Sequence, residues 1–310
     1  MEKEIYDLVI IGSGPSGLTC GIYATRSNLK TLILEKGMIG GQASLTNNID
    51  NYPALNGISG FELMSKMFEH ATSLGVEFLN EEVLSLELND KIKKIILKDK
   101  TIETKAIVLA LGAKAKKLNV KGEEKFLGKG VAYCAVCDGG FYKNKSVVVV
   151  GGGNSAVEDA IYLSNVASSV TVVSKKSDFT CNEYLKSEIT KLINQNKIKV
   201  YFDSVIYEIK GDDKVNEIVV KCPMCKFPSL KCDGVFVAVG RNPDNSILTN
   251  TKIELNSRGY VVVNSNMETN IKGVFACGDV IDKEMRQIIT ACADGAVASN
   301  SVNKYIRSKF

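Results

Sequence analysis

The chain has 310 residues, which corresponds to roughly two domains, and its 45% hydrophobic and 24% charged residues are ordinary for a soluble globular protein. The net charge of +4, from 39 basic and 35 acidic residues, is too small to indicate a nucleic-acid partner. The single histidine, His70, excludes histidine-based metal sites and a Ser-His-Asp triad.

The N-terminal segment is predicted to form a buried strand and not a signal peptide. Its apolar run, residues 8–11, is short and leads directly into a glycine turn. No apolar run is long enough to span a bilayer. The nine cysteines are an odd number and mostly scattered, unlike a secreted disulfide framework. We therefore expect a cytoplasmic protein with no membrane partner.

A first dinucleotide fingerprint follows this strand. Residues 6–11 precede the pattern G-x-G-x-x-G, and a helix is predicted over residues 18–26. The first glycine makes the turn, the second lets a pyrophosphate approach the backbone, and the third packs helix on strand. The fingerprint residues are Gly12, Ser13, Gly14, Pro15, Ser16 and Gly17.

The ribose position of this first fingerprint is acidic. The next strand, residues 31–34, ends at Glu35, about 20 residues after the fingerprint begins. A carboxylate there accepts hydrogen bonds from a ribose hydroxyl and repels a 2′-phosphate. The first site therefore suits an adenosine with a free ribose, such as that of FAD.

Cys134-Ala-Val-Cys137-Asp138 is the most informative motif of the chain. Two cysteines with this spacing can close a small disulfide that exchanges with thiols. Asp138 is then placed to protonate a departing thiolate. The alternatives are a zinc site and inert thiols. Zinc is disfavoured because the chain has no second, matching C-x-x-C nearby at the spacing of a zinc finger.

A second fingerprint follows the cysteine pair. The strand 146–150 leads into a glycine turn, and a helix is predicted over residues 157–165. At the position equivalent to Glu35 stands Ser174, followed by Lys175 and Lys176. Two cations without a carboxylate favour a 2′-phosphate and hence NADPH, although a solvated strand end is the alternative. The nucleotide-binding residues of this copy are Gly151, Gly153, Asn154, Ser155, Ala156, Lys175 and Lys176.

Further strands that end in glycine support a protein with two bound nucleotides. Residues 107–113 and 235–240 are similar apolar segments and are predicted to mark the crossings between domains. Residues 273–280 form another such segment that ends in Gly278-Asp279, and this aspartate is placed to hydrogen-bond the ribityl chain of a flavin.

A second cysteine cluster lies where a hairpin is expected, between strands 217–221 and 235–239. Cys222, Cys225 and Cys232 there could ligate zinc, form a second exchangeable disulfide, or remain reduced on a surface loop. The remaining cysteines are expected to be buried small hydrophobes, with Cys292 at a helix start near the flavin. They are Cys20, Cys181, Cys277 and Cys292.

In order and spacing, these motifs resemble those of the low-molecular-weight bacterial thioredoxin reductases, a group of FAD- and pyridine-nucleotide-dependent disulfide oxidoreductases. The resemblance covers nearly the whole chain and rests on GSGPSG, GGQ, CAVCD, GGGNSA, VFACGD and an Arg-Gln pair. It assigns further residues to FAD. These are Gly40, Gly41, Gln42, Asn51, Val83, Gly278, Asp279, Arg286, Gln287 and Ile288.

The resemblance implies an α/β fold with two Rossmann-like dinucleotide-binding domains, the second inserted into the first. The FAD domain would comprise residues 1–113 and 242–310, and the pyridine-nucleotide domain residues 114–241. Electrons would pass from NADPH through FAD and the Cys134–Cys137 disulfide to thioredoxin. Cys137 would face the flavin, Cys134 would attack thioredoxin, and Asp138 would be the acid. A homodimer is also implied.

The second nucleotide site departs from the family pattern. Where the family carries His-Arg-Arg and a further arginine, this chain has Ser174-Lys175-Lys176 and Thr180. Lysine lacks the bidentate fork of arginine, and Asp178 adds a negative charge.

The electron donor therefore has alternatives: NADPH through the lysines, NADH with relaxed discrimination, or ferredoxin in place of a nucleotide. A non-enzymatic alternative is a metal- or redox-sensing module built on Cys222, Cys225 and Cys232.

Overall fold

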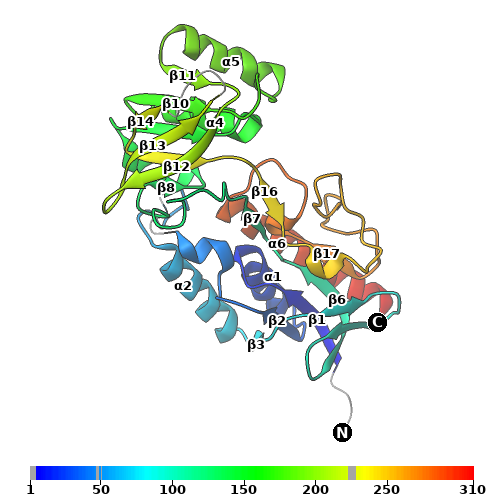
Figure 1. The fold of residues 1–310 in the computed structure, drawn as a ribbon. Helices are drawn as coiled ribbons and strands as arrows, with labels where there is room; N and C mark the ends of the chain where they lie inside the picture. The colour runs from blue at the N-terminus through cyan, green and yellow to red at the C-terminus, as the bar shows by residue number, and fades with distance from the viewer. Residues whose placement is uncertain (1–4, 47–48, 50, 223–227) are drawn as a thin grey trace. The chain divides into compact units, whose positions relative to one another are not determined.

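The computed structural model describes residues 5–46, 49, 51–222 and 228–310. It divides the chain into two compact units, both visible in Figure 1. Unit 1 combines Met1–Lys114 with Asn242–Phe310, and unit 2 is Ala115–Arg241. The chain leaves unit 1 and later returns to it, so unit 2 is an insertion. The first crossing lies one residue later than the bounds expected from the sequence.

Within the described residues, unit 1 is built on a seven-stranded sheet. Strands β1, β2, β3, β6 and β17 pair in parallel, while β4 and β5 add an antiparallel edge. The sheet order is β3 (Glu77–Asn80), β2 (Thr31–Glu35), β1 (Ile5–Ile11), β6 (Thr101–Leu109), β5 (Lys93–Ile96) and β4 (Ser85–Glu87), with β17 (Val274–Ala276) also on β6.

Strand β1 shows why this sheet lies inside the unit. Leu8 and Ile10 pack into one apolar cluster, whereas Val9 and Ile11 pack into another. Successive side chains of a strand point to opposite faces, so a strand that is apolar throughout must be covered on both. The helical elements of unit 1 are α1 (Pro15–Arg26), η1 (Gly41–Leu45), α2 (Gly60–Ser73), η3 (Ser246–Leu248), η4 (Gly278–Val280) and α6 (Ile288–Lys309).

Helices α1 and α6 approach each other closely at one glycine. A Cβ atom added to Gly295 would lie 2.2 Å from the backbone oxygen of Ser16. Only glycine permits this approach, because contacts below 3.0 Å essentially never occur for a real Cβ atom. The first turns of α6 are thereby held against the first turn of α1, where the glycine fingerprint ends.

Unit 2 repeats the same plan around a five-stranded parallel sheet of described residues. Its order is β11 (Ile198–Tyr201), β10 (Ser169–Val173), β9 (Ser146–Val150), β15 (Gly234–Val237) and β8 (Val131–Ala132). An antiparallel sheet is added to it, with β12 (Val205–Gly211), β13 (Val215–Lys221) and β14 (Ser229–Lys231). The helical elements are α3 (Ala135–Asp138), η2 (Gly139–Tyr142), α4 (Asn154–Ser164) and α5 (Glu183–Asn194).

Two short strands lie where the chain crosses between the units. β7 (Ala113–Ala115) pairs with β16 (Arg241–Pro243) in a two-stranded sheet. The expected strands at these crossings extended to residues 113 and 240. In the structure β6 ends at Leu109 and β15 at Val237, because Gly112 and Gly240 adopt left-handed backbone angles, with φ of 71° and 103°.

The expected fold class, α/β with two Rossmann-like domains, is confirmed. Each unit has a parallel sheet whose first βαβ turn carries one of the two fingerprints. In the part of the chain that the structure describes, none of the helices combines the length and the hydropathy that a membrane crossing requires.

Candidate active site

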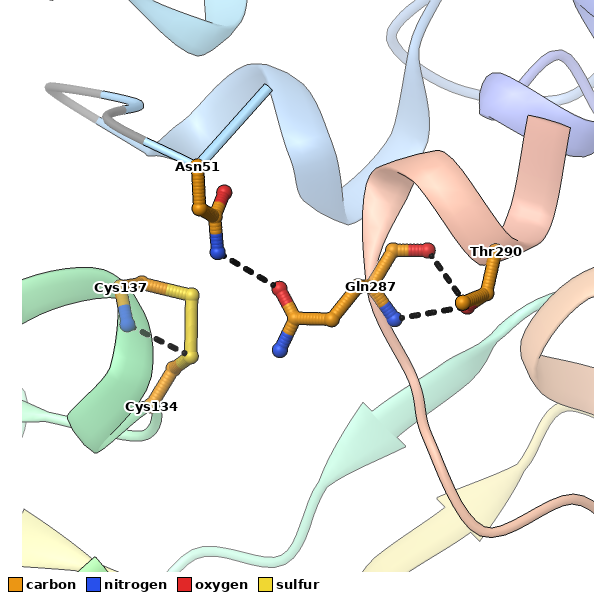
Figure 2. Close-up of a disulfide and its surroundings, with 5 residues drawn as sticks. All are labelled: Asn51, Cys134, Cys137, Gln287 and Thr290. Carbon is orange, nitrogen blue, oxygen red and sulfur yellow. Dashed lines mark hydrogen bonds between the residues drawn. A yellow bond between two sulfur atoms is a disulfide. The ribbon is translucent and has the colours of Figure 1, made fainter. Parts of the chain in front are cut away.

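Cys134 and Cys137 form a disulfide, with their Cα atoms 5.3 Å apart (Figure 2). The two residues bracket the single turn of α3, where Cys134 is the N-cap and its Sγ accepts a hydrogen bond of 3.2 Å from the Cys137 amide. This hydrogen bond ties the two ends of the turn together beside the disulfide.

A buried carboxylate anchors the residue that precedes Cys134. The hydroxyl of Tyr133 donates to Glu123 at 2.8 Å, and Glu123 also accepts from the amides of Leu118 and Asn119 at 2.8 and 2.7 Å. Glu123 is only 1% exposed. Burial and the Glu123 carboxylate raise the pKa of Tyr133, so its hydroxyl remains a donor. The sequence did not predict this pair, because nothing in the local pattern marks it.

Asp138 lies at the end of α3, directly after Cys137. Burial raises the pKa of its carboxyl group. The group therefore keeps its proton to a higher pH than an exposed aspartate does, and a protonated carboxyl can give a proton to a departing thiolate. This environment fits the role expected for Asp138.

The first fingerprint in unit 1 has the geometry of a dinucleotide turn. Gly12 has a φ of 107°, and a Cβ atom there would lie 2.3 Å from the Ala110 oxygen. A Cβ atom on Gly17 would lie 2.0 Å from the Gly12 oxygen. Gly14, in contrast, has nothing within 4 Å of a built Cβ atom. The turn is therefore tightly packed at both ends and open at Gly14, where a pyrophosphate would approach the helix N-terminus.

Glu35 holds its expected place at the end of β2. One carboxylate oxygen accepts from the amide and hydroxyl of Ser13 at 2.9 and 2.8 Å, and the other accepts from the Gly37 amide at 2.9 Å. These bonds fix the carboxylate beside the glycine turn. Because an ionised carboxylate has about four acceptor positions, one remains for a ribose hydroxyl.

The residues assigned to FAD by resemblance lie on several loops of unit 1. The Gly40 amide donates to the Ser13 backbone oxygen at 3.0 Å, which joins the Gly40-Gly41-Gln42 segment to the first turn. Asn51 donates to the side chain of Gln287 at 3.1 Å, and Gln287 forms the N-terminal cap of α6 with Thr290 (Figure 2). Ile288 is the first residue of α6.

Val83 lies apart from these polar contacts. It is 6% exposed and belongs to the apolar cluster that contains Val9 and Ile11. Its surroundings explain its burial, and a contact with FAD stays a prediction.

The Gly278-Asp279 segment is tied to α1 and α6. Gly278 has a φ of 78°, and a Cβ atom there would lie 2.4 Å from the Ser16 hydroxyl oxygen. Its amide donates to Asp294 at 3.2 Å, and Asp294 forms a largely buried ion pair with Lys283 at 2.5 Å. This network fixes the loop that presents Asp279, although no sequence pattern marks Lys283 or Asp294.

Arg286 has one buried side-chain donor that is free to bind a ligand at this site. Its guanidinium donates to the backbone oxygens of Lys283 and Ile281 and stacks 4.3 Å from the Tyr260 ring centroid. Its Nε atom is buried without a hydrogen-bond partner among the described residues. A buried donor without a partner is unfavourable, so this atom is suited to an acceptor of a ligand. Together with the open Gly14, the residues fit FAD.

The second fingerprint in unit 2 has the same geometry as the first. Gly151 has a φ of 142°, and a Cβ atom there would lie 2.4 Å from the Ala238 oxygen and 2.8 Å from the Ala156 Cβ atom. Gly153 has nothing within 4 Å of a built Cβ atom, so a diphosphate can approach. Asn154 opens α4, and its side chain accepts from the Asn182 amide at 3.0 Å. The residues present here fit a second dinucleotide.

The chain matches the model of the pyridine nucleotide-disulphide oxidoreductase family over residues 6–295. It belongs to this family. A thioredoxin reductase of Bacillus subtilis is 39% identical, over 98% of this chain and 96% of the relative. A 34.2 kDa protein in the rubredoxin operon of Clostridium pasteurianum is 44% identical over 99% of both chains.

Among solved structures, the thioredoxin reductase of Streptococcus pyogenes superimposes with a TM-score of 0.90 at 40% identity, covering 98% of this chain and 99% of that one. The expected family, and an enzyme that is an oxidoreductase of disulfides, are thus confirmed. FAD and NADPH are consistent with the family and with these relatives.

The second nucleotide site has a serine and two lysines directly after β10, Ser174, Lys175 and Lys176. Ser174 is 1% exposed and packs against Gly152, so it cannot approach a ribose. Lys175 and Lys176 are exposed, and within the described residues neither forms an ion pair. Both lysines are therefore available to an anion.

Asp159 is a titratable group of unit 2 that no sequence motif marks. It lies on α4, beyond the fingerprint. Burial, reinforced by the Glu158 charge and opposed by Arg241, raises its pKa to about 7. Its ionisation is therefore expected to occur near neutral pH.

Among the described residues, no group of three or more His, Cys, Asp or Glu side chains could hold a metal ion. Cys222 is disulfide-bonded, Cys225 lies outside the described residues, and Cys232 is a buried free thiol whose pKa burial raises to about 12. A disulfide-bonded sulfur is not a thiolate ligand.

The expectation for the scattered cysteines is correct with one exception. Cys20, Cys277 and Cys292 are buried. Cys181 was also expected to be buried, and this was wrong, because it is partly exposed in the loop that precedes α5.

Proposed function

We propose that the protein is a thioredoxin reductase that passes electrons from NADPH through FAD and the Cys134–Cys137 disulfide to thioredoxin. The observation that carries the proposal is this disulfide, which is followed by the half-buried Asp138 and by a complete second fingerprint in the same unit. The full-length similarity to thioredoxin reductases supports thioredoxin as the substrate.

In this proposal unit 1 holds FAD and unit 2 holds NADPH. The open Gly14 and the N-terminus of α1 bind the FAD pyrophosphate, Glu35 the ribose, and Asp279 the ribityl chain. FAD accepts a hydride as an electron pair and delivers the pair to a disulfide. Gly153 and the N-terminus of α4 bind the NADPH diphosphate, and Lys175 and Lys176 bind its 2′-phosphate.

The cysteine pair carries the exchange with thioredoxin. Two electrons and two protons convert the Cys134–Cys137 disulfide into two thiols. The Cys134 thiolate attacks a sulfur of the thioredoxin disulfide. Cys137 then displaces thioredoxin as a dithiol and restores the disulfide, while Asp138 supplies a proton to the leaving thiolate.

Three further assignments belong to this proposal: the active form is a homodimer, the protein acts in the cytoplasm, and ferredoxin is not the donor. The intact turn at Gly151 and Gly153 and the free lysines support a nucleotide donor over ferredoxin. Sedimentation or size exclusion with light scattering tests the dimer, which a mass of one chain, 33.7 kDa, would contradict.

The deciding experiment is anaerobic stopped-flow absorbance of the bound flavin. The oxidised holoprotein is mixed separately with NADPH, NADH and reduced ferredoxin. We expect rapid bleaching with NADPH, followed by thioredoxin-dependent recovery that Cys134→Ser and Cys137→Ser abolish. Bleaching by ferredoxin alone would falsify the donor assignment, and recovery in both serine variants would refute the role of the disulfide.

A further inference from the structure

The loop between β10 and α5, residues 174–182, lies beside the second glycine turn. The Thr180 amide donates to the Gly152 oxygen at 2.7 Å, and the Asn182 amide donates to Asn154 at 3.0 Å. Phe179 is 7% exposed and packs edge-on against Phe202, with ring centroids 5.0 Å apart. The loop is therefore anchored at several points, and its charged side chains have a defined place relative to the fingerprint.

The charges of this loop are mixed. Lys175, Lys176 and Asp178 are all exposed. Asp178 is paired with Lys186, which projects from the first turns of α5, and the partner side chains are 58% and 36% exposed. Lys186 lowers the pKa of Asp178, and Asp178 in turn raises the pKa of Lys186, so both remain charged at neutral pH.

Thr180 contributes no charge to a bound phosphate. Its amide and its hydroxyl both point to the Gly152 oxygen, at 2.7 and 3.3 Å. The loop thus offers two lysines and one aspartate, and the cation that offsets the aspartate comes from α5. Without Lys186, Asp178 would repel an anion bound by Lys175 and Lys176.

We propose that the Asp178–Lys186 pair is the specificity-determining element that sets the preference for NADPH over NADH. The inference rests on the proposed binding of NADPH at the second fingerprint. Lys186 acts through Asp178: it cancels the carboxylate charge next to the 2′-phosphate and makes no contribution to a nucleotide that lacks this phosphate. Removal of Lys186 lowers the preference, and removal of the Asp178 charge raises it.

The test measures binding without electron transfer. Oxidised holoprotein is titrated by calorimetry with 2′,5′-ADP, which carries the 2′-phosphate, and with 5′-AMP, which lacks it. We expect Lys186→Gln to weaken 2′,5′-ADP binding by about two- to fivefold, the range of an exposed charge pair, and Asp178→Asn to strengthen it by a similar factor. The double variant should return close to the wild type, and 5′-AMP binding should not change.

A matched control lies on the same helix. Lys191 pairs with Glu188 at 2.6 Å, so Lys191→Gln makes the same change of charge in a pair without Asp178. It should leave 2′,5′-ADP binding unchanged. Salt should shrink the effect of Lys186→Gln, because the charges are exposed.

The outcomes separate the inference from the proposed function. Equal effects on 2′,5′-ADP and 5′-AMP, or the same loss in Lys191→Gln, would overturn the specificity role of the pair. If 2′,5′-ADP does not bind the wild type, or binds a Lys175→Gln/Lys176→Gln variant equally well, the nucleotide site itself is assigned wrongly, and the inference fails with it. Flavin absorbance and circular dichroism verify that each variant is folded.

Discussion

The hydroxyl of Tyr133 donates a hydrogen bond of 2.8 Å to Glu123, and Cys134 is the next residue of the chain. Glu123 is buried and already accepts from the amides of Leu118 and Asn119. The segment that precedes the disulfide is thus hydrogen-bonded to the Glu123 carboxylate, which accepts from three donors.

Tyr133→Phe should lower the free energy of unfolding by about 1–2 kcal/mol, because it removes one donor from a buried charged acceptor. Chemical denaturation followed by circular dichroism measures the loss. Tyr184→Phe, at a tyrosine that is 74% exposed, is the control and should leave stability unchanged. An equal loss in both variants would show that the hydrogen bond from Tyr133 to Glu123 does not contribute to the free energy of unfolding.

Asp138→Asn should lower kcat/KM for thioredoxin, and the size of the loss should depend on pH. Burial raises the pKa of Asp138, so the wild-type carboxyl is protonated below that pKa and loses its proton as the pH rises through it. The acid contribution is therefore largest at low pH, where the variant should be slower by about 100-fold, and the gap should narrow at high pH. The profile of kcat/KM for thioredoxin between about pH 5 and 9 measures this, and parallel profiles would contradict the acid role.

Asp159→Asn should stabilise the protein at alkaline pH only. The pKa of Asp159 is raised to about 7 in the folded protein, so the folded state holds this proton to a higher pH than the unfolded chain does. Its favourable contribution is complete below the unfolded pKa of about 4 and is lost as the pH rises to the folded value.

The expected gain of Asp159→Asn at about pH 8, after a discount for its remaining exposure, is about 2 kcal/mol, and no gain is expected at about pH 4. Urea denaturation at both pH values measures it. Asp203→Asn, at an exposed aspartate of the same unit, is the control. A gain that is equal at both pH values would contradict the titration of Asp159.

Two glycines of the first turn should respond differently to alanine. Gly17→Ala places a Cβ atom 2.0 Å from the Gly12 oxygen and should destabilise unit 1 by more than about 2 kcal/mol. Gly14→Ala meets nothing within 4 Å, so the fold should persist while FAD is lost. Thermal denaturation and the FAD content of the purified variants distinguish the two. A fully loaded Gly14→Ala protein would show that the pyrophosphate does not approach there.

Cys181 should be the first free thiol to react with an alkylating reagent. It is partly exposed, whereas the other described free thiols are buried, namely Cys20, Cys232, Cys277 and Cys292. Burial raises the pKa of Cys232 and of Cys277 to about 12, which suppresses their thiolate forms. Peptide mass spectrometry after brief treatment of the native protein with iodoacetamide measures the order. Earlier labelling of any buried thiol would contradict it.

Features that depend on short, local patterns are predictable from the sequence. Each fingerprint requires glycines at fixed offsets between a strand and a helix, so Gly12 and Gly151 mark both turns in the sequence alone. The spacing of Cys134 and Cys137 likewise predicts a disulfide that a single helical turn can close. Strand ends are less predictable, because Gly112 and Gly240 bend the chain where the apolar pattern still continues.

By itself, then, the sequence determined the fold class, the cysteine pair and the acid at the first ribose, since backbone geometry and residue chemistry fix these within a few positions. Only the tertiary structure decided which polar and charged side chains contact one another. Glu123 contacts Tyr133, Asp294 contacts Lys283, and Lys186 contacts Asp178 because the chain folds back between the two residues of each pair. The same packing decides how far each side chain is buried. Burial raises the pKa of the Asp138 carboxyl group, whereas Cys181 remains partly exposed.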